Sequence, residues 1–192
     1  MKRKVVAITG GIGSGKSLVR DIVQKKGYFS IDCDSLAREV SSRPQVVQSV
    51  EQLLGSEFVE NGKLNRRAIR NKIFSDCNLL ESYNALFFEE VKKLLDERIG
   101  GLQGNDVSPV FVEISVFDAF EYPWDEVWLV EAKKLTRVNR VMERDLTDRQ
   151  VVSDIMSRQR VCRKYTVKLT NDGTVDDLKT QVETALVNLL ES

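Results

Sequence analysis

Histidine is absent from this sequence of 192 residues. Catalytic triads that depend on histidine, His-ligated metal sites and imidazole general bases are therefore excluded. If the protein is an enzyme, its proton chemistry depends on a carboxylate, a lysine, a tyrosine or a metal ion.

Cysteine and long apolar segments are also scarce. Cys33, Cys77 and Cys162 are odd in number, far apart and in no metal-ligand spacing, which is typical of a reducing compartment. The apolar run near the N-terminus is too short for a signal-peptide core, and no later stretch is long enough to span a bilayer. We therefore expect a cytoplasmic protein with no membrane partner.

Net charge is the third absence, because 29 basic residues balance 29 acidic ones. A molecule without net charge is not a general polyanion binder, so no nucleic-acid partner is expected. Positive charge is nevertheless concentrated between Lys133 and Lys168, with eleven Lys or Arg against four acids. This run is either a solvated helical face or a set of phosphate clamps.

Short apolar strands alternate with helical patterns along the chain, and this alternation predicts an α/β fold with a five-stranded parallel sheet covered on both faces. The strands are expected at residues 5–9, 28–32, 109–115, 126–131 and 166–170. The helices are expected at residues 15–26, 35–40, 44–54, 65–74, 79–99, 133–144, 147–160 and 174–190. The last of these helices opens with Thr-x-x-Asp, a start that resembles a capping box.

The predicted organisation is a single domain over 1–192, with a core of about 1–34 and 108–192. The helical block of about 35–105 contains no predicted strand and is too large for one crossover. It is expected to be an inserted acceptor-binding subdomain, and the basic segment of about 133–164 is expected to be a lid.

A glycine-rich loop joins the first predicted strand to the first predicted helix. Its sequence, Gly10-x-x-x-x-Gly15-Lys16-Ser17, matches the phosphate-binding loop pattern of a three-layer P-loop NTPase-type fold. In such a loop the peptide N–H groups surround phosphate, the lysine bridges the β- and γ-phosphates, and the serine hydroxyl binds Mg²⁺. A tight turn of unrelated purpose is the alternative. The expected ATP-binding residues of the loop are Gly11, Ile12, Gly13, Ser14, Gly15, Lys16 and Ser17, with Ser17 as the metal ligand.

The loop alone does not separate kinases from other P-loop proteins. The sequence lacks the Asn-Lys-x-Asp guanine signature, and it is short for a large ATPase machine. A P-loop kinase of a small molecule is therefore favoured.

Two acids follow the second predicted strand, in the segment "IDCDSLAREV" at residues 31–40. Asp32 and Asp34 lie at the carboxyl end of a parallel strand, where such sheets bind their ligands. An acceptor hydroxyl needs a carboxylate to orient it and take its proton, and without histidine either acid is a candidate. The alternative is that these two acids cap the following helix, a position to which Asp34, just before "SLAREV", is well suited.

Together these segments resemble the dephospho-CoA kinase family. "ITGGIGSGKS" and "IDCDSLAREV" match its first two motifs, and "NGKLNRRAIRNKIF" (61–74) is similar to its helix entry. "RVNRVMERD" (137–145) resembles its lid, Gln159 its following glutamine, and "NDG" (171–173) its late Asn-x-Gly. The resemblance runs nearly end to end.

The resemblance implies ATP-dependent phosphorylation of the ribose 3′-hydroxyl of dephospho-CoA. It implies that Asp34, Lys16 and Arg140 are catalytic, with ATP and Mg²⁺ as cofactors and dephospho-CoA as the acceptor. The other implied contacts are Asp32, Arg38 and Asp118 on the acceptor side, Arg140 and Arg144 as lid cations, and Asn171 and Gly173 near adenine.

Three segments depart from the family pattern. Phe87 and Phe88 replace its His-Pro, "SVFDAF" (115–120) replaces its Pro-Leu-Leu-Phe/Tyr-Glu, and "YTVKLT" (165–170) shortens its Ala-Asp-x-Val-Ile. Asp118 then stands in for the family acid. Two alternatives to dephospho-CoA kinase remain, a P-loop kinase for another small acceptor (a nucleoside, nucleotide or sugar) and a non-catalytic nucleotide-binding regulator.

Glu113 and the aromatic residues complete the candidates. Glu113 closes the apolar run "PVFVE", where it either orders the water shell of a metal or is a surface acid at a strand end. Phe111, Phe117 and Phe120 are expected in the core rather than stacked on a substrate.

Overall fold

The computed structural model describes residues 3–73, 77–102, 108–159, 162 and 164–191. Parts of the predicted ranges, at residues 1–2, 74–76, 103–107, 160–161, 163 and 192, lie outside the described residues. The chain divides into two compact units, Met1–Asp32 with Asn105–Ser192, and Cys33–Gly104. Each unit is described by itself below.

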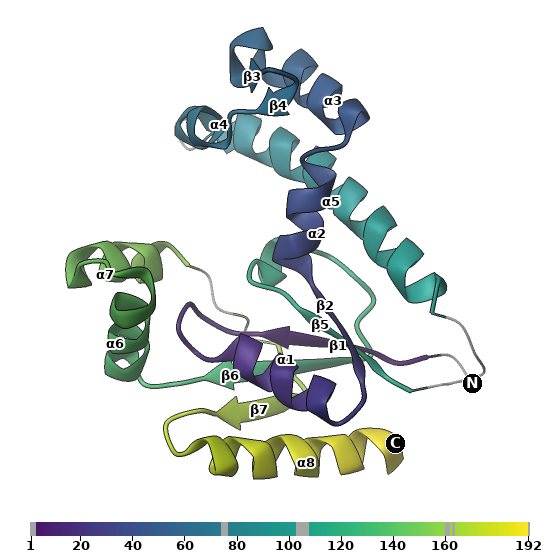
Figure 1. Cartoon of the computed structure of the whole chain (residues 1–192), viewed down its shortest axis with the longest axis vertical. Helices are drawn as coiled ribbons and strands as arrows, with labels where there is room; N and C mark the ends of the chain where they lie inside the picture. Colours follow the sequence, from purple (N-terminus) through teal and green to yellow (C-terminus); the bar gives the residue numbers. More distant parts are fainter. Residues whose placement is uncertain (1–2, 74–76, 103–107, 160–161, 163, 192) are drawn as a thin grey trace. The chain divides into compact units, whose positions relative to one another are not determined.

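The first unit is built on a five-stranded parallel sheet with strand order β2-β5-β1-β6-β7 (Figure 1). The predicted five-stranded parallel sheet is therefore confirmed. The strands are β1 (Val5–Thr9), β2 (Phe29–Asp32), β5 (Val110–Glu113), β6 (Glu126–Glu131) and β7 (Val167–Thr170).

Strand β1 occupies the centre of this sheet. All five of its residues are buried, as expected for a parallel strand covered on both faces. It pairs with β5 on one side and β6 on the other, with Ile8 opposite both Glu113 and Trp128. The carboxyl ends of β1, β2 and β5 therefore meet at one edge of the sheet.

Helices α1 (Lys16–Lys25) and α8 (Val175–Glu191) pack against the same side of the sheet (Figure 1). Val19 and Val23 of α1 and Val182 of α8 are fully buried there, in one cluster with Phe111 and Trp128. The ring centroids of Phe111 and Trp128 lie 5.1 Å apart. The core placement predicted for Phe111 is confirmed.

The predicted capping box of the last helix is also confirmed. Thr174 precedes α8, and its hydroxyl accepts a hydrogen bond from the Asp177 backbone N–H at 3.1 Å. In return, the Asp177 carboxylate accepts from the Thr174 backbone N–H at 2.8 Å. Two otherwise unpaired N–H groups at the helix start are thereby satisfied.

We expect Thr174→Ala to lower the melting temperature by roughly 3 °C, because loss of a helix cap costs about 1 kcal/mol. Thermal unfolding followed by circular dichroism measures the shift. Thr180→Ala is the matched control: its hydroxyl donates to the Asp176 carbonyl within the same helix, and no loss of stability is expected. Equal melting temperatures for Thr174→Ala and the wild type would contradict the cap.

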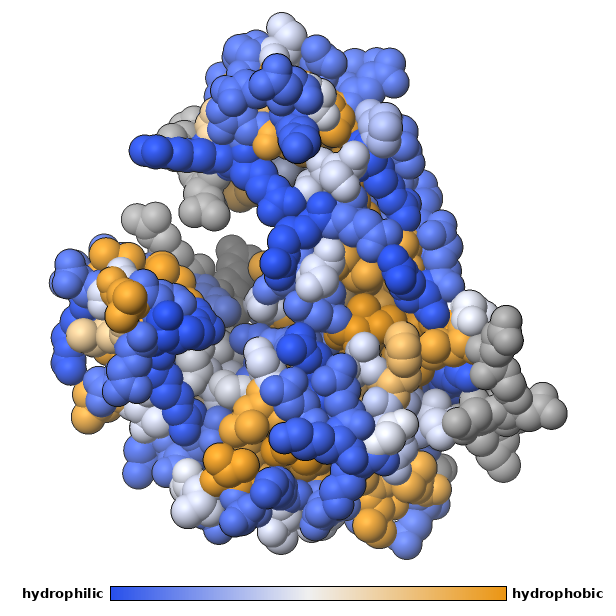
Figure 2. Space-filling model, viewed as in Figure 1, coloured by the Kyte–Doolittle hydropathy of each residue, from blue (hydrophilic) through white to orange (hydrophobic). Residues whose placement is uncertain are grey.

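A helical hairpin of α6 (Lys134–Asp145) and α7 (Arg149–Arg158) extends from the same unit (Figure 1). It has a small core of its own, formed by Val138, Val141 and Val152. Its surface carries apolar side chains as well, visible in Figure 2. The exposed ones are Leu135, Leu146, Val151 and Ile155.

The second unit is helical, with α2 (Cys33–Val40), α3 (Pro44–Leu54), α4 (Arg66–Ile73) and α5 (Cys77–Gly100). The prediction that this block contains no strand is wrong, because β3 (Val59–Glu60) and β4 (Lys63–Leu64) form an antiparallel hairpin. Asn61 and Gly62, with φ of 51° and 73°, make the turn that such two-residue hairpins favour. Across the described part of the chain, no helix combines the length and apolar character needed to cross a membrane.

Candidate active site

The glycine-rich loop lies between β1 and α1, in the structural context that the sequence predicts. Gly10 and Gly15 adopt φ of 151° and 102°, a region that favours glycine. A Cβ at Gly10 would overlap the Val130 carbonyl, and one at Gly15 would overlap the Asn171 side chain. The loop therefore folds closely against β6 and the end of β7.

Lys16 begins α1 and is almost fully buried, with 9% of its surface exposed. Its Nζ donates hydrogen bonds to the Gly10 carbonyl at 3.0 Å and the Gly11 carbonyl at 3.4 Å. A buried ammonium group held across the loop is a strong attraction for an anion bound there, because burial reduces solvent screening.

Ser17 hydrogen-bonds to Glu113 at the edge where the strands end. The Ser17 hydroxyl donates to Glu113 Oε1 at 2.9 Å. Arg20, one helical turn further along α1, places Nη1 2.9 Å from Glu113 Oε2 and 3.5 Å from Asp32 Oδ2. Asp32 and Glu113 are themselves register partners on neighbouring strands.

Glu113 is 8% exposed, so the alternative that it is a surface acid is wrong. Burial raises the pKa of its carboxyl group, although the Ser17 hydrogen bond and the nearby Arg20 oppose the rise. The strand-end position in the sequence indicated Glu113 as a candidate for ordering the water shell of a metal, but the sequence gave no signal for Arg20.

On the sequence-based expectation that Glu113 orders the water shell of a metal, we expect Glu113→Gln to lower kcat by about ten- to a hundredfold. The melting temperature should not fall, because a raised pKa means that the buried charge destabilises the fold above that pKa. Steady-state kinetics and thermal unfolding of the ligand-free protein at pH 7.5 measure both effects. Glu121→Gln, on an exposed loop, is the control; a clear loss of stability in Glu113→Gln would mean that the Arg20 ion pair outweighs burial.

Asn171 supports the loop from the end of β7. It is 3% exposed, and its Nδ2 donates to the Ser14 carbonyl at 2.8 Å. Arg140 of α6 lies beside it, with Nη2 3.5 Å from Asn171 Oδ1. Arg140 Nη1 is buried without a hydrogen-bond partner among the described residues, so this guanidinium can still receive an anion. Gly173 lies two residues further along, against the Asp177 carboxylate.

The arginines of the hairpin differ in their surroundings. Arg144 is 63% exposed and makes a two-pronged ion pair with the neighbouring Asp145, at 2.7 and 2.8 Å. Arg137, which was not among the predicted site residues, instead donates from Nε to the Ile12 carbonyl at 2.8 Å. Burial lowers the pKa of Arg137.

Asp34 and Arg38 belong to the helical unit. Helix α2 begins at Cys33, so Asp32 directly precedes the helix and Asp34 lies in its first turn. The capping alternative is therefore wrong for Asp34. Its Cα is two residues from that of Asp32 and so within about 7 Å of it along the chain. Arg38 lies one turn further, is exposed, and donates from Nε to the Asp34 carbonyl at 3.2 Å.

Arg66 is a second cation beside Arg38 that was not singled out from the sequence. Its Nη2 lies 3.5 Å from the Arg38 carbonyl and also bonds the Ser41 hydroxyl. The half-buried phenol of Tyr83 is close enough to Arg66 for its charge to act on it: partial burial raises the Tyr83 pKa, and Arg66 partly offsets the rise.

Comparison with known proteins settles the family. The family model described as dephospho-CoA kinase matches residues 4–177. The chain belongs to the dephospho-CoA kinase family. The dephospho-CoA kinase of Thermus thermophilus is 32% identical over 196 residues, covering 96% of this chain and 91% of the relative.

Solved structures agree with this family fold. A Thermus thermophilus protein, TT1252, is 31% identical and superposes with a TM-score of 0.84, covering 98% of this chain and 99% of that one. The dephospho-CoA kinase from Campylobacter jejuni, at 19% identity, has a TM-score of 0.69 with 98% of each chain covered. The resemblance to dephospho-CoA kinases inferred from the sequence is therefore confirmed.

The loop after β5 is one of the three segments in which this chain departs from the family pattern. It is aromatic: Phe117 stacks on Trp124 at 6.3 Å, and Phe120 is buried, as predicted. Phe117 itself is only half-buried, and Asp118 is exposed. Burial is the main cause that raises the pKa of the Cys162 thiol, and the charge of Asp118 adds to the rise.

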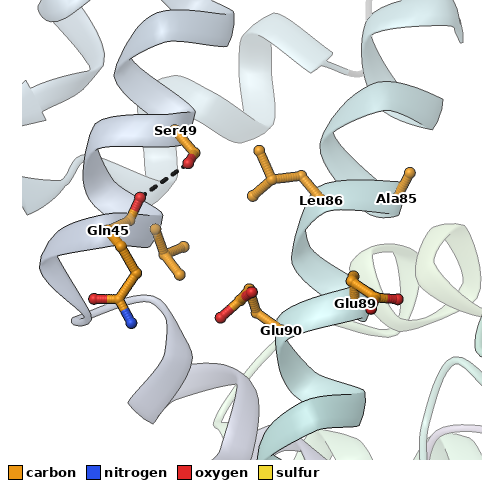
Figure 3. Close-up of a pocket in the computed structure, with 7 residues that line it drawn as sticks. Gln45, Ser49, Ala85, Leu86, Glu89 and Glu90 are labelled. Carbon is orange, nitrogen blue, oxygen red and sulfur yellow. Dashed lines mark hydrogen bonds between the residues drawn. The ribbon is translucent and has the colours of Figure 1, made fainter.

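The helical unit also holds an open cavity of about 400 Å³ between α3 and α5 (Figure 3). The lining residues are Gln45, Val46, Ser49, Ala85, Leu86, Glu89 and Glu90. Two carboxylates and no cation line it, so it is unsuited to a phosphate group. Arg38 and Arg66, which contact each other elsewhere in this unit, are not among the lining residues.

Proposed function

We propose that this protein transfers the γ-phosphoryl group of ATP to the ribose 3′-hydroxyl of dephospho-CoA, giving coenzyme A and ADP. The observation that carries the proposal is the sheet edge at which the loop, Ser17, Glu113 and Asp32 meet. Asp34 follows this edge by two residues. A chain of this family thus carries a phosphate-binding loop and, just after the same sheet edge, an acceptor-side carboxylate.

On the ATP side, the loop peptides and Lys16 bind the β- and γ-phosphates. Arg140 neutralises the charge that develops on the transferring group. This assignment is supported by its Nη1, which has no hydrogen-bond partner among the described residues. Arg144 would have to exchange Asp145 for ATP when the hairpin α6–α7 acts as a lid. Asn171 and Gly173 are assigned to the adenine side.

The oxygen atoms at the sheet edge fit a magnesium ion. Mg²⁺ prefers oxygen ligands, keeps most of its water molecules and takes few ligands from the protein. The Ser17 hydroxyl would hold the ion directly. Glu113, whose Oε1 lies 2.9 Å from the Ser17 hydroxyl oxygen, would bind the water molecules of the ion. The described residues contain no group of three or more acidic or thiol ligands that could make an all-protein metal site, which agrees with a metal bound largely by nucleotide. When bound, the ion would offset the negative charge of the phosphates.

On the acceptor side, Asp34 orients the 3′-hydroxyl and takes its proton. The hydroxyl oxygen then forms a bond to the γ-phosphorus, and the bond from that phosphorus to the β–γ bridging oxygen breaks, releasing ADP. Asp32, Arg38 and Asp118 are assigned as acceptor contacts. The helical unit is the acceptor-binding part, and a reducing cytoplasm suits the free thiols of Cys33 and Cys162.

The test is mass spectrometry of the products after incubation with Mg²⁺-ATP and dephospho-CoA. A species heavier by one phosphoryl group, with ADP formed in equal amount, is expected. A parallel panel of nucleosides, nucleotides and sugars covers the other acceptors. Transfer only to a panel member would reassign the acceptor, and ATP binding without any transfer would identify a regulator.

A further inference from the structure

Ile12, in the middle of the phosphate-binding loop, contacts the helical hairpin through its side chain, its backbone N–H and its carbonyl. Its side chain packs against the hairpin core of Val138, Val141 and Val152. Its backbone N–H donates to Gln159 Oε1 at 2.7 Å. Its carbonyl accepts from Arg137 Nε at 2.8 Å.

These contacts come from both helices of the hairpin. Arg137 lies on α6, and Gln159 is the residue that ends α7. The two hydrogen bonds are part-buried and thus shielded from competing water. One peptide unit on each side of Ile12 is therefore fixed by residues that the sequence places far from the loop.

The glycines of the loop allow α6 to approach its backbone. A Cβ at Gly13 would lie 2.6 Å from the Arg137 carbonyl oxygen and 2.9 Å from Val141 Cγ2. A Cβ at Gly11 would overlap the Arg137 guanidinium. The hairpin therefore packs directly on the loop backbone.

We propose that Arg137 and Gln159 are positioning residues, which hold the peptide groups of Ile12 so that the loop is preformed for the phosphates of ATP. The same contacts couple the loop to the hairpin. We call Arg137 and Gln159 together the loop clamp. Arg140 lies three residues after Arg137 on the same helical face, so the loop clamp sets the position of Arg140 relative to the loop. A preformed loop binds more tightly because less ordering has to accompany binding.

This inference rests on the proposed function only in taking ATP as the nucleotide, and it can be tested without any acceptor. Arg137→Met removes the guanidinium but keeps an apolar stem, and Gln159→Leu removes the acceptor oxygen at similar size. Arg149→Met, on the exposed first turn of α7, is the matched control for loss of an arginine.

Titration calorimetry with Mg²⁺-ATP gives the first readout. Arg137→Met and Gln159→Leu are each expected to raise the dissociation constant about tenfold, the effect of one lost hydrogen bond. Their double variant should be little worse than either, because both hold the same residue. Arg149→Met should bind like the wild type. In steady state, KM for ATP should rise while KM for the acceptor stays unchanged.

Hydrogen–deuterium exchange gives the second readout. ATP should slow amide exchange in both the loop (10–17) and the hairpin (134–158) of the wild type, but only weakly in the hairpin of the two clamp variants. Unchanged ATP affinity with only a lower melting temperature would overturn the inference and leave the two side chains a structural role. If either variant does not fold, normal ATP affinity and hairpin protection in the other would overturn it as well. Absence of coenzyme A formation would affect the proposed function alone.

Discussion

Asp34→Asn is expected to lower kcat by about 10³-fold, since a positioned carboxylate that takes a proton contributes roughly 10²–10⁴ to the rate. The asparagine keeps the size of the side chain but cannot accept the proton of the 3′-hydroxyl. Without histidine anywhere in the chain, no imidazole can replace it.

Asp34→Asn should leave ATP binding and thermal stability nearly unchanged. Asp34 is an exposed residue of α2 in the helical unit, whereas the phosphate-binding loop belongs to the other unit. KM for ATP and the ATP dissociation constant should therefore stay near their wild-type values. The melting temperature should also change little, because an exposed side chain in a first helical turn contributes little to stability.

Steady-state kinetics with dephospho-CoA and calorimetric titration with ATP measure both quantities. Glu51→Gln, which removes a carboxylate from α3 of the same unit, is the matched control and should have wild-type kinetics. Near-normal kcat in Asp34→Asn would contradict its role as the base, and Asp32→Asn would be the next variant to measure.

Lys16→Ala is expected to lose about 10³-fold in kcat, similar to removal of one preorganised donor from a charge-stabilising site. The buried ammonium group is bonded to two loop carbonyls. Lys16 is the one charged residue in the loop sequence at 10–17. Its removal also leaves these carbonyls without that donor, so the affinity for ATP should fall together with kcat.

Lys16→Met separates charge from packing in this position, because it keeps most of the apolar stem. Both variants should show the same kinetic loss if the charge is responsible. Lys25→Ala, at the exposed end of the same helix, is the control and should be fully active. Substantial activity in Lys16→Met would show that the stem, not the ammonium group, matters.

Much of the fold could be predicted because the signals are local. The short apolar runs of β1 and β5 and the glycines of the loop each predict their own conformation, and the helix caps do the same. The β3–β4 hairpin was missed although Asn61-Gly62 is a strong turn signal, because each strand has only two residues.

The missed parts of the site are contacts between distant residues. Ser17 and Glu113 are 96 residues apart, and Ile12 is 125 residues from Arg137 and 147 from Gln159. No spacing rule connects such pairs, and only the sheet and the hairpin bring them together. Arg144 differs from these pairs, because its ion-pair partner Asp145 is the next residue in the sequence. The sequence predicted the charge of Arg144 but not this ion pair.

The position of β1 at the centre of the sheet has a consequence for synthesis on the ribosome. Both partners of this strand lie more than a hundred residues later in the chain, at Val110–Glu113 and Glu126–Glu131. The helical unit, Cys33–Gly104, is continuous and is complete before either partner has been made. We therefore expect the nascent chain to fold its middle first, with the apolar β1 segment waiting unpaired until the second half has emerged.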